Sequence, residues 1–136
     1  MKKKRVIIIL IIFSAFMSEK CSSPADTSST ATYFTIKIDS VQAPASVFLR
    51  DTVKLRVWGI IGANSNYSFS NLESSLSNSK IELTFIGKHM PAYTAEDVII
   101  QFQGDVFPIV PISKGPFEII INEPDRSVLK DTVYVY

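Results

Sequence analysis

Apolar and polar residues alternate along most of the chain from residue 33 onward. Phe34, Ile36 and Ile38 alternate with polar residues in the first run, and the same pattern recurs near residues 53–57, 67–69, 81–85, 98–102, 117–121 and 133–135. A period of two is typical of a β-strand with one buried and one exposed face. These seven runs, with turn residues between them and without helical periodicity, predict an all-β fold, namely a seven-stranded antiparallel sandwich.

Two proline-containing segments mark breaks between the expected strands. The sequence EPDRS at residues 123–127 has the Pro-Asp pair of a tight turn and predicts a hairpin between the last two strands. Pro44 has no backbone N–H to donate, so we expect it to interrupt the first strand at a sheet edge. Both breaks fit the spacing of the seven runs.

Five segments carry a wider strand pattern, in the order APASVFLRDTVKLRVWG, NYSFSN, SKIELTFIG, ISKGPFEIIIN and DTVYV. This pattern resembles small immunoglobulin-like domains in envelope lipoproteins of Bacteroidetes. The resemblance implies one immunoglobulin-like β-sandwich over residues 33–136. The chain lacks the cysteine pair of true immunoglobulin domains, its single tryptophan, Trp58, stands on the second strand, and Phe117 replaces their corner tyrosine.

The start of the chain has the composition of a targeting signal. Residues 2–5 are Lys-Lys-Lys-Arg, and residues 6–17 are apolar except for Ser14. As a helix the apolar run would be about 18 Å long, whereas the hydrocarbon core of a bilayer is about 30 Å thick. We therefore interpret residues 1–20 as a secretory signal peptide rather than a transmembrane anchor.

The only cysteine, Cys21, follows this segment. Its position resembles the bacterial lipoprotein signal, which implies cleavage before Cys21 and a diacylglyceryl group on its thiol. Acyl chains would hold the protein on a membrane and would cap a thiol that is otherwise free in an oxidising compartment. The alternative is an ordinary secretory peptide with a free thiol. Glu19 and Lys20 differ from the small residues usual before the cysteine, which leaves the cleavage site open.

Residues 21–32 are mostly small and polar and predict a flexible acylated tether ahead of the domain. The resemblance to envelope lipoproteins implies a lipid anchor in the outer membrane of a bacterial cell envelope. In the lipoproteins that the chain resembles, a dense acidic run after the cysteine favours export to the cell surface. The sequence after Cys21 lacks such a run, so the resemblance implies the periplasmic side of that membrane.

Cleavage also changes the charge of the chain. The full sequence carries 14 basic and 13 acidic residues, a net charge of +1. Removal of residues 1–20 takes away five basic residues and one acidic residue, so 9 basic and 12 acidic residues remain, a net charge of −3. A mildly acidic chain without a basic stripe is a poor match for nucleic acid.

Candidate catalytic and metal-binding groups are few. His89 is the only histidine, so the sequence offers neither a multi-histidine zinc site nor a serine–histidine–aspartate triad with a second base. We expect His89 in a solvated loop. The acidic pairs Glu96–Asp97 and Glu123–Asp125 are expected in water near strand ends or in a turn, not across a catalytic cleft. We therefore expect a non-enzymatic protein without a metal or a cofactor.

Trp58 is the first candidate for ligand binding. It shares the parity of Lys54 and Arg56, which places the indole on the outer face of its strand as a binding platform. A bulge at Gly59 would instead turn the indole into the core. Of these two arrangements we expect the buried one.

Two further features are candidates for binding. Residues 64–79 are rich in serine and asparagine and predict a long polar connection between strands. Tyr134 and Tyr136 share the outward parity of the last strand, where they either face a partner or simply favour strand formation.

The sequence thus predicts a membrane-anchored envelope lipoprotein that acts as a non-enzymatic interaction or structural module. Its partner would be an envelope protein or a glycan. One alternative is a glycan-binding accessory protein that uses an exposed Trp58. A further alternative is a small enzyme inhibitor that uses residues 64–79.

Overall fold

The computed structural model describes residues 30–92 and 94–136, and this part of the chain forms strands without a helix. Its nine strands are β1 (Thr32–Thr35), β2 (Ser40–Gln42), β3 (Ser46–Val47), β4 (Val53–Gly62), β5 (Tyr67–Leu76), β6 (Lys80–His89), β7 (Ile100–Ile109), β8 (Gly115–Asn122) and β9 (Val128–Val135). The predicted signal peptide and most of the predicted tether lie outside the described residues. β1 begins at Thr32, the last residue of the predicted tether.

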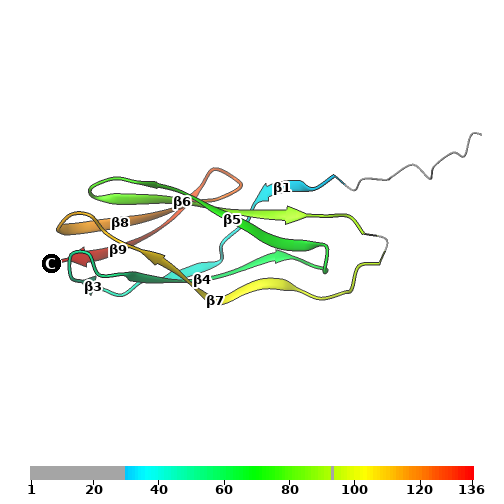
Figure 1. Ribbon diagram of the computed structural model, residues 1–136, viewed down its shortest axis with the longest axis horizontal. Coiled ribbons are helices and arrows are strands. Elements are labelled where there is room, and N and C mark those ends of the chain that lie inside the picture. Colours follow the sequence, from blue (N-terminus) through cyan, green and yellow to red (C-terminus); the bar gives the residue numbers. More distant parts are fainter. Residues whose placement is uncertain (1–29, 93) are drawn as a thin grey trace, which may run out of the picture.

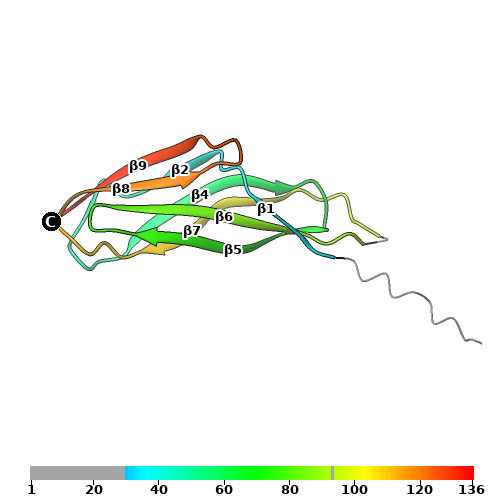
Figure 2. The same cartoon turned by 90° about the horizontal axis from the view of Figure 1, so that it is seen from above.

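The strands form two sheets packed as layers (Figures 1 and 2). In the large sheet, β6 pairs with β5 on one side and with β1 and β8 on the other, and β9 and β3 continue the sheet beyond β8. The small sheet has the order β2-β4-β7. The all-β class is confirmed, but the prediction of seven strands is wrong, because the described residues form nine.

Two parallel pairs also differ from the predicted antiparallel arrangement. β6 is parallel to β8, with Lys80 opposite Glu118, and β3 is parallel to β9, with Ser46 opposite Tyr134. β7 lies in the small sheet, so the chain leaves β6, crosses to the other layer and returns in β8 with the same direction. Parallel pairing requires such a crossover, and the alternation within each strand does not report it.

The first predicted strand is divided between the two layers. β1 pairs with β6 in the large sheet, whereas β2 pairs with β4 in the small sheet. Pro44 lies between β2 and β3, so the predicted interruption at this proline is confirmed. The count rises from seven to nine because residues 32–47, where the sequence predicted one strand interrupted at Pro44, contain β1, β2 and β3.

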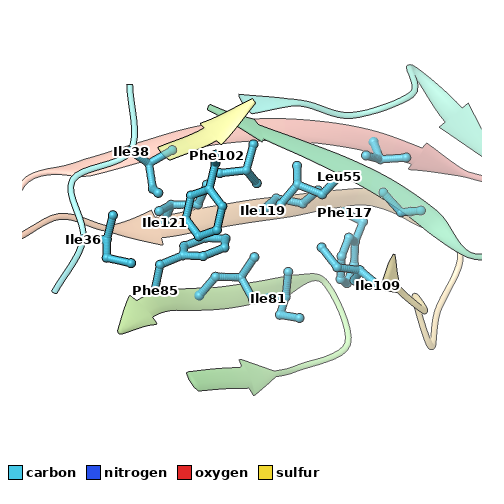
Figure 3. Close-up of a cluster of buried hydrophobic side chains, with 14 of the residues drawn as sticks. Ile36, Ile38, Leu55, Ile81, Phe85, Phe102, Ile109, Phe117, Ile119 and Ile121 are labelled. Atoms are coloured by element: carbon cyan, nitrogen blue, oxygen red, sulfur yellow. The ribbon is translucent and has the colours of Figure 1, made fainter. Parts of the chain in front are cut away.

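Residues 36–39 cross from one layer to the other. The Ile36 N–H donates a hydrogen bond to the Phe85 carbonyl (2.8 Å), and the Ile38 N–H lies 3.3 Å from each carboxylate oxygen of Glu123. Both isoleucine side chains are buried between the sheets (Figure 3). The crossing therefore contributes to the core while its backbone is satisfied by groups outside a regular ladder.

The core between the sheets is apolar in the described part of the chain, with no buried polar side chain. Phe85 lies inside it and packs edge-on against Phe102 and Phe107, with ring centroids 5.7 and 4.9 Å away. Phe69 of β5 packs on the same cluster, 5.3 Å from the Phe102 ring centroid. Phe117 is fully buried, as expected for the residue at the corner position.

The hairpin predicted at residues 123–127 is confirmed and joins β8 to β9. The Glu123 N–H donates to the Ser127 carbonyl (3.0 Å), and the Arg126 N–H donates to the Glu123 carbonyl (3.1 Å). Arg126 has a φ of 67°, the left-handed conformation that ends a three-residue hairpin loop. The Asp125 carboxylate accepts hydrogen bonds from the Ser127 N–H (3.0 Å) and hydroxyl (2.6 Å), which fixes the turn.

The prediction of a long polar connection at residues 64–79 is wrong, because β5 occupies most of that stretch and pairs with β6. Tyr67, Phe69 and Leu72 of β5 pack against the core, while its serines are exposed. Pairing with β6 and the packing of these few apolar side chains on the core are enough to keep a strand of polar composition at the edge of the sheet. His89 is likewise not in a loop: it ends β6 and packs against the Tyr67 ring, with centroids 4.5 Å apart.

Candidate functional site

Trp58 lies on the outer face of the small sheet. Its neighbours Val57 and Gly59 are buried, whereas Trp58 is half-buried. The residues opposite it are Ser40 on β2 and Gln103 on β7, and both are exposed. The expected bulge at Gly59 and the inward turn of the indole are not observed.

The bulge lies on the facing strand instead. Val57 is opposite Asp105 and Trp58 is opposite Gln103, so Gly104 is the extra residue in β7. Gly104 has a φ of +86°, a conformation that glycine adopts without steric cost. A Cβ at this position would lie 3.1 Å from Cζ2 and 3.5 Å from Nε1 of the indole. Gly104 therefore provides the space in which the Nε1 side of the indole rests against β7.

Cationic and amide side chains lie beside Trp58 on the same surface, together with the exposed Ile60. Lys54 and Arg56 precede it on the outer face of β4, and both are exposed. Gln42 of β2 is opposite Arg56, and exposed glutamines of β7 continue the face. We call this surface the Trp58 face and define it by six residues: Gln42, Lys54, Arg56, Trp58, Gln101 and Gln103.

A groove of about 380 Å³ lies at the cationic end of the Trp58 face. It is lined by Gln42, Ala43, Pro44, Val47, Thr52, Lys54 and Arg56. None of these lining residues is acidic, and neither cation forms an ion pair with a described residue; the ion pair found in this part of the chain joins Lys80 to Glu82 on the large sheet. The two positive charges are therefore open to a ligand from solution.

Tyr134 and Tyr136 form a second exposed surface, on the large sheet near the C-terminus (Figure 1). Their side chains are 49% and 56% exposed, with ring centroids 4.9 Å apart. Phe48, 69% exposed, lies 6.4 Å from the Tyr136 ring and was missed by the sequence analysis. Val47, Phe48 and Leu49 are three consecutive apolar residues, so they cannot all face the core of a strand. This break in the alternation was the signal that one of them is exposed. These tyrosines lie on the other sheet from Trp58 and do not share its site.

The acidic residues of the β8–β9 turn have opposite pKa shifts. Partial burial raises the pKa of the Glu123 carboxyl, although the hydrogen bond from the Ile38 N–H opposes this effect. The hydroxyl and N–H of Ser127 hold the pKa of Asp125 below its ordinary value. Carboxyl groups shifted apart in this way occur in acid–base sites. Here, however, each accepts a backbone hydrogen bond that holds the turn or the crossing segment, which indicates a structural role.

The other predicted acidic pair, Glu96 and Asp97, is exposed and precedes β7. The backbone of Glu96 is tied to Ser65, since its carbonyl accepts from the Ser65 N–H (3.0 Å) and its N–H donates to the Ser65 hydroxyl (2.9 Å). Over residues 30–92 and 94–136, no three histidine, cysteine, aspartate or glutamate side chains are grouped so that they could hold a metal ion.

Cys21, the predicted site of lipid attachment, lies outside the described residues. Within the described ranges, no helix combines the length and the apolar composition needed to span a membrane.

Comparisons with known proteins give no relative of the chain: no protein-family model, curated protein or solved structure matches it. The arrangement of side chains on the Trp58 face is therefore the basis for the functional proposal.

Proposed function

We propose that this chain is a non-enzymatic interaction module of a bacterial cell envelope, and that the Trp58 face is its binding surface. The observation that carries the proposal is the placement of Trp58, which follows Lys54 and Arg56 on the outer face of β4 and rests against the bulge at Gly104. An indole that is partly wet and lies among hydrogen-bonding groups has the composition of a binding hot spot.

A glycan is the ligand that this composition favours. Glutamine amides both donate and accept hydrogen bonds, as sugar hydroxyls require, and an indole offers an apolar surface to a sugar ring. Gln103 is directly opposite Trp58, and Gln42 is one rung along the sheet, opposite Arg56. The second candidate function from the sequence, a glycan-binding accessory protein, is thus a specific form of the proposed interaction module.

The proposal is tested by affinity electrophoresis of the purified full chain in gels containing a panel of neutral and acidic polysaccharides. Trp58→Ala should abolish retention and still unfold cooperatively, because the indole is only half-buried. The double variant Tyr134→Ala/Tyr136→Ala is the matched control on the other sheet and should be retained like the unaltered chain. Full retention of Trp58→Ala, or failure of the unaltered chain to bind any polymer, would contradict the proposal.

Cys21 is the proposed attachment point of the lipid, in the outer membrane and on its periplasmic side. Labelling of growing cells with an alkyne analogue of palmitate should mark the unaltered chain and not Cys21→Ala. Protease added to intact cells should leave a C-terminal epitope intact until the outer membrane is permeabilised. An unlabelled native chain would refute the anchor, and loss of the epitope from intact cells would place the domain at the cell surface.

The immunoglobulin-like relationship also remains a proposal. The pairing of β4 with β7 and the β8–β9 hairpin support it. True immunoglobulin domains place the second strand beside the fifth and the last two strands side by side, and β4 and β7 correspond to the second and fifth of the seven predicted runs. The parallel pairs β6–β8 and β3–β9 depart from that pattern. The inhibitor hypothesis relied on residues 64–79 as a loop, and no observation favours it now that β5 occupies that stretch.

A further inference from the structure

We infer that the ligand of the Trp58 face is an acidic polysaccharide, and that Lys54 and Arg56 bind its carboxylate groups in the groove beside Trp58. This inference rests on the proposed function, because it names the class of glycan that the same face would take.

The charge at the groove is the first argument. Lys54 and Arg56 both line it, and none of the other lining residues carries a charge. Asp131 of β9 contacts the lining: its carboxylate accepts hydrogen bonds from the backbone N–H of Ala43 (3.1 Å) and from that of Thr132 (2.8 Å). The groove thus presents two cations, and neither forms an ion pair with a described residue.

The shape of the cationic row indicates an extended ligand. Lys54, Arg56 and Trp58 are alternate residues of one strand, so their side chains stand about 6.7 Å apart and the row is about 13 Å long. A single inorganic anion would occupy only part of this row. A chain of sugars can instead place a carboxylate at the cations and an apolar ring surface at the indole.

The chemistry of the cations favours carboxylates spaced along a chain. The planar guanidinium of Arg56 can bind a carboxylate with two parallel hydrogen bonds, and Lys54 adds a point charge. Gln42, opposite Arg56, supplies an amide for neighbouring hydroxyl groups. A densely charged polymer such as nucleic acid fits less well, because residues 21–136 together carry a net charge of −3 and only two cations face this groove.

The test compares two polymers that differ in the carboxylate alone. Binding of the full chain, purified in detergent, is measured by affinity electrophoresis with polygalacturonate and with the same polymer after chemical reduction of its carboxyl groups. The acidic polymer should bind about tenfold more tightly, the effect of roughly one charge-assisted hydrogen bond. Its affinity should fall as the salt concentration rises.

The double variant Lys54→Gln/Arg56→Gln keeps long polar side chains and removes both charges. It should lose the preference for polygalacturonate over the reduced polymer. The matched control, Lys114→Gln/Lys130→Gln, changes the net charge equally at two exposed positions away from the groove and should retain the preference. Loss of the preference in the control variant would show an unspecific charge effect and would overturn the inference.

The outcomes distinguish the acidic ligand from the binding function of the Trp58 face. Equal binding of both polymers, reduced by Trp58→Ala, would overturn the acidic ligand and leave the proposed binding function in place. Binding of neither polymer, nor of any other in the panel, would overturn both. A preference for polygalacturonate that depends on Lys54 and Arg56 would support both.

Discussion

The indole of Trp58 packs against Gly104, the residue at which the register of β4 and β7 shifts. A bulge glycine on one strand thereby sets how the tryptophan of the neighbouring strand lies on the sheet. Since Trp58 is the only tryptophan of the chain, the tryptophan emission reports on the surroundings of this one indole.

Gly104→Ala should destabilise the domain and expose the indole. A residue with a Cβ adopts a positive φ at a cost of about 1–2 kcal/mol. The added Cβ would also lie 3.1 Å from the indole Cζ2, so the ring must shift away from it by a few tenths of an ångström. We expect a lower free energy of unfolding in urea and a red shift of the tryptophan emission.

Gly115→Ala is the matched control for this contact. Gly115 also has a positive φ, of +107°, but a Cβ there would meet no atom within 4 Å. Gly115→Ala should therefore lower the free energy of unfolding by a similar amount, through the cost of the positive φ, and leave the emission spectrum unchanged. An equal red shift in both variants would show that the contact between Gly104 and Trp58 does not hold the indole.

Gly59→Ala should destabilise the domain through the crossing segment. A Cβ at Gly59 would lie 2.7 Å from the Lys37 carbonyl oxygen and 3.2 Å from the Ile38 Cα. Both are backbone atoms, so residues 36–39 must shift, and overpacking of this kind costs about 1–3 kcal/mol. Urea denaturation measures the loss. The neighbouring Ile60, 54% exposed, gives the control Ile60→Ala, with an expected change within about 0.5 kcal/mol.

Phe85→Ala should be among the most damaging truncations. The ring is fully buried and contacts Phe102 and Phe107 edge-on. Removal of a buried phenylalanine ring costs about 3–5 kcal/mol. Phe48→Ala removes the same ring from an exposed position and should change the unfolding free energy by less than about 0.5 kcal/mol. Similar losses in the two variants would contradict the described core.

Glu123 should make the stability depend on pH in an unusual direction for a carboxylate. Partial burial raises its pKa in the folded protein above the unfolded value, so the folded state holds the proton more tightly. Its contribution is then fully present below the unfolded pKa, near 4.5, and is lost as the pH rises through the folded pKa. Glu123→Gln cannot ionise, so it should lack this loss while its amide oxygen still accepts from the Ile38 N–H.

The measurement is the difference in unfolding free energy between Glu123→Gln and the unaltered chain from pH 4 to pH 7. The difference should move in favour of the variant as the pH rises. Asp125, whose pKa is lowered, acts in the opposite direction but is present in both proteins. Glu123→Ala removes the acceptor as well and should be less stable than Glu123→Gln at each pH. A difference that stays constant with pH would refute the raised pKa.

The alternation of apolar and polar residues predicted the strands that have one face on the core and the other toward solvent. In β6, Ile81, Leu83 and Phe85 are buried and the residues between them are not, so the period of two was visible in the sequence. For β5 only the run at residues 67–69 was predicted as strand, because an edge strand needs few apolar residues and the serines around and after this run suggested a polar connection. The first run continued its alternation through residues 36–39 while the backbone changed partners, and composition carries no trace of that change.

Part of the candidate site could be predicted in the same way. The outward parity of Trp58 followed from that of Lys54 and Arg56, whereas its half-burial depends on Gly104, which meets it only through pairing of β4 with β7. The groove depends on Ala43 and Pro44, which the crossing segment brings beside β4. Long-range pairing of this kind leaves no local pattern in the sequence.

The place where the chain enters the domain determines how it carries a mechanical load. β1 begins at the end of the molecule away from the C-terminus and runs antiparallel to β6, with Thr32 opposite His89 and Thr35 opposite Ile86 (Figures 1 and 2). Tension applied through the preceding residues therefore acts along the strand axis, and the bonds between β1 and β6 are strained in shear rather than opened one at a time. The buried Ile36 and Ile38 follow directly and must be drawn out of the core next. A domain loaded in this way would resist unfolding under tension.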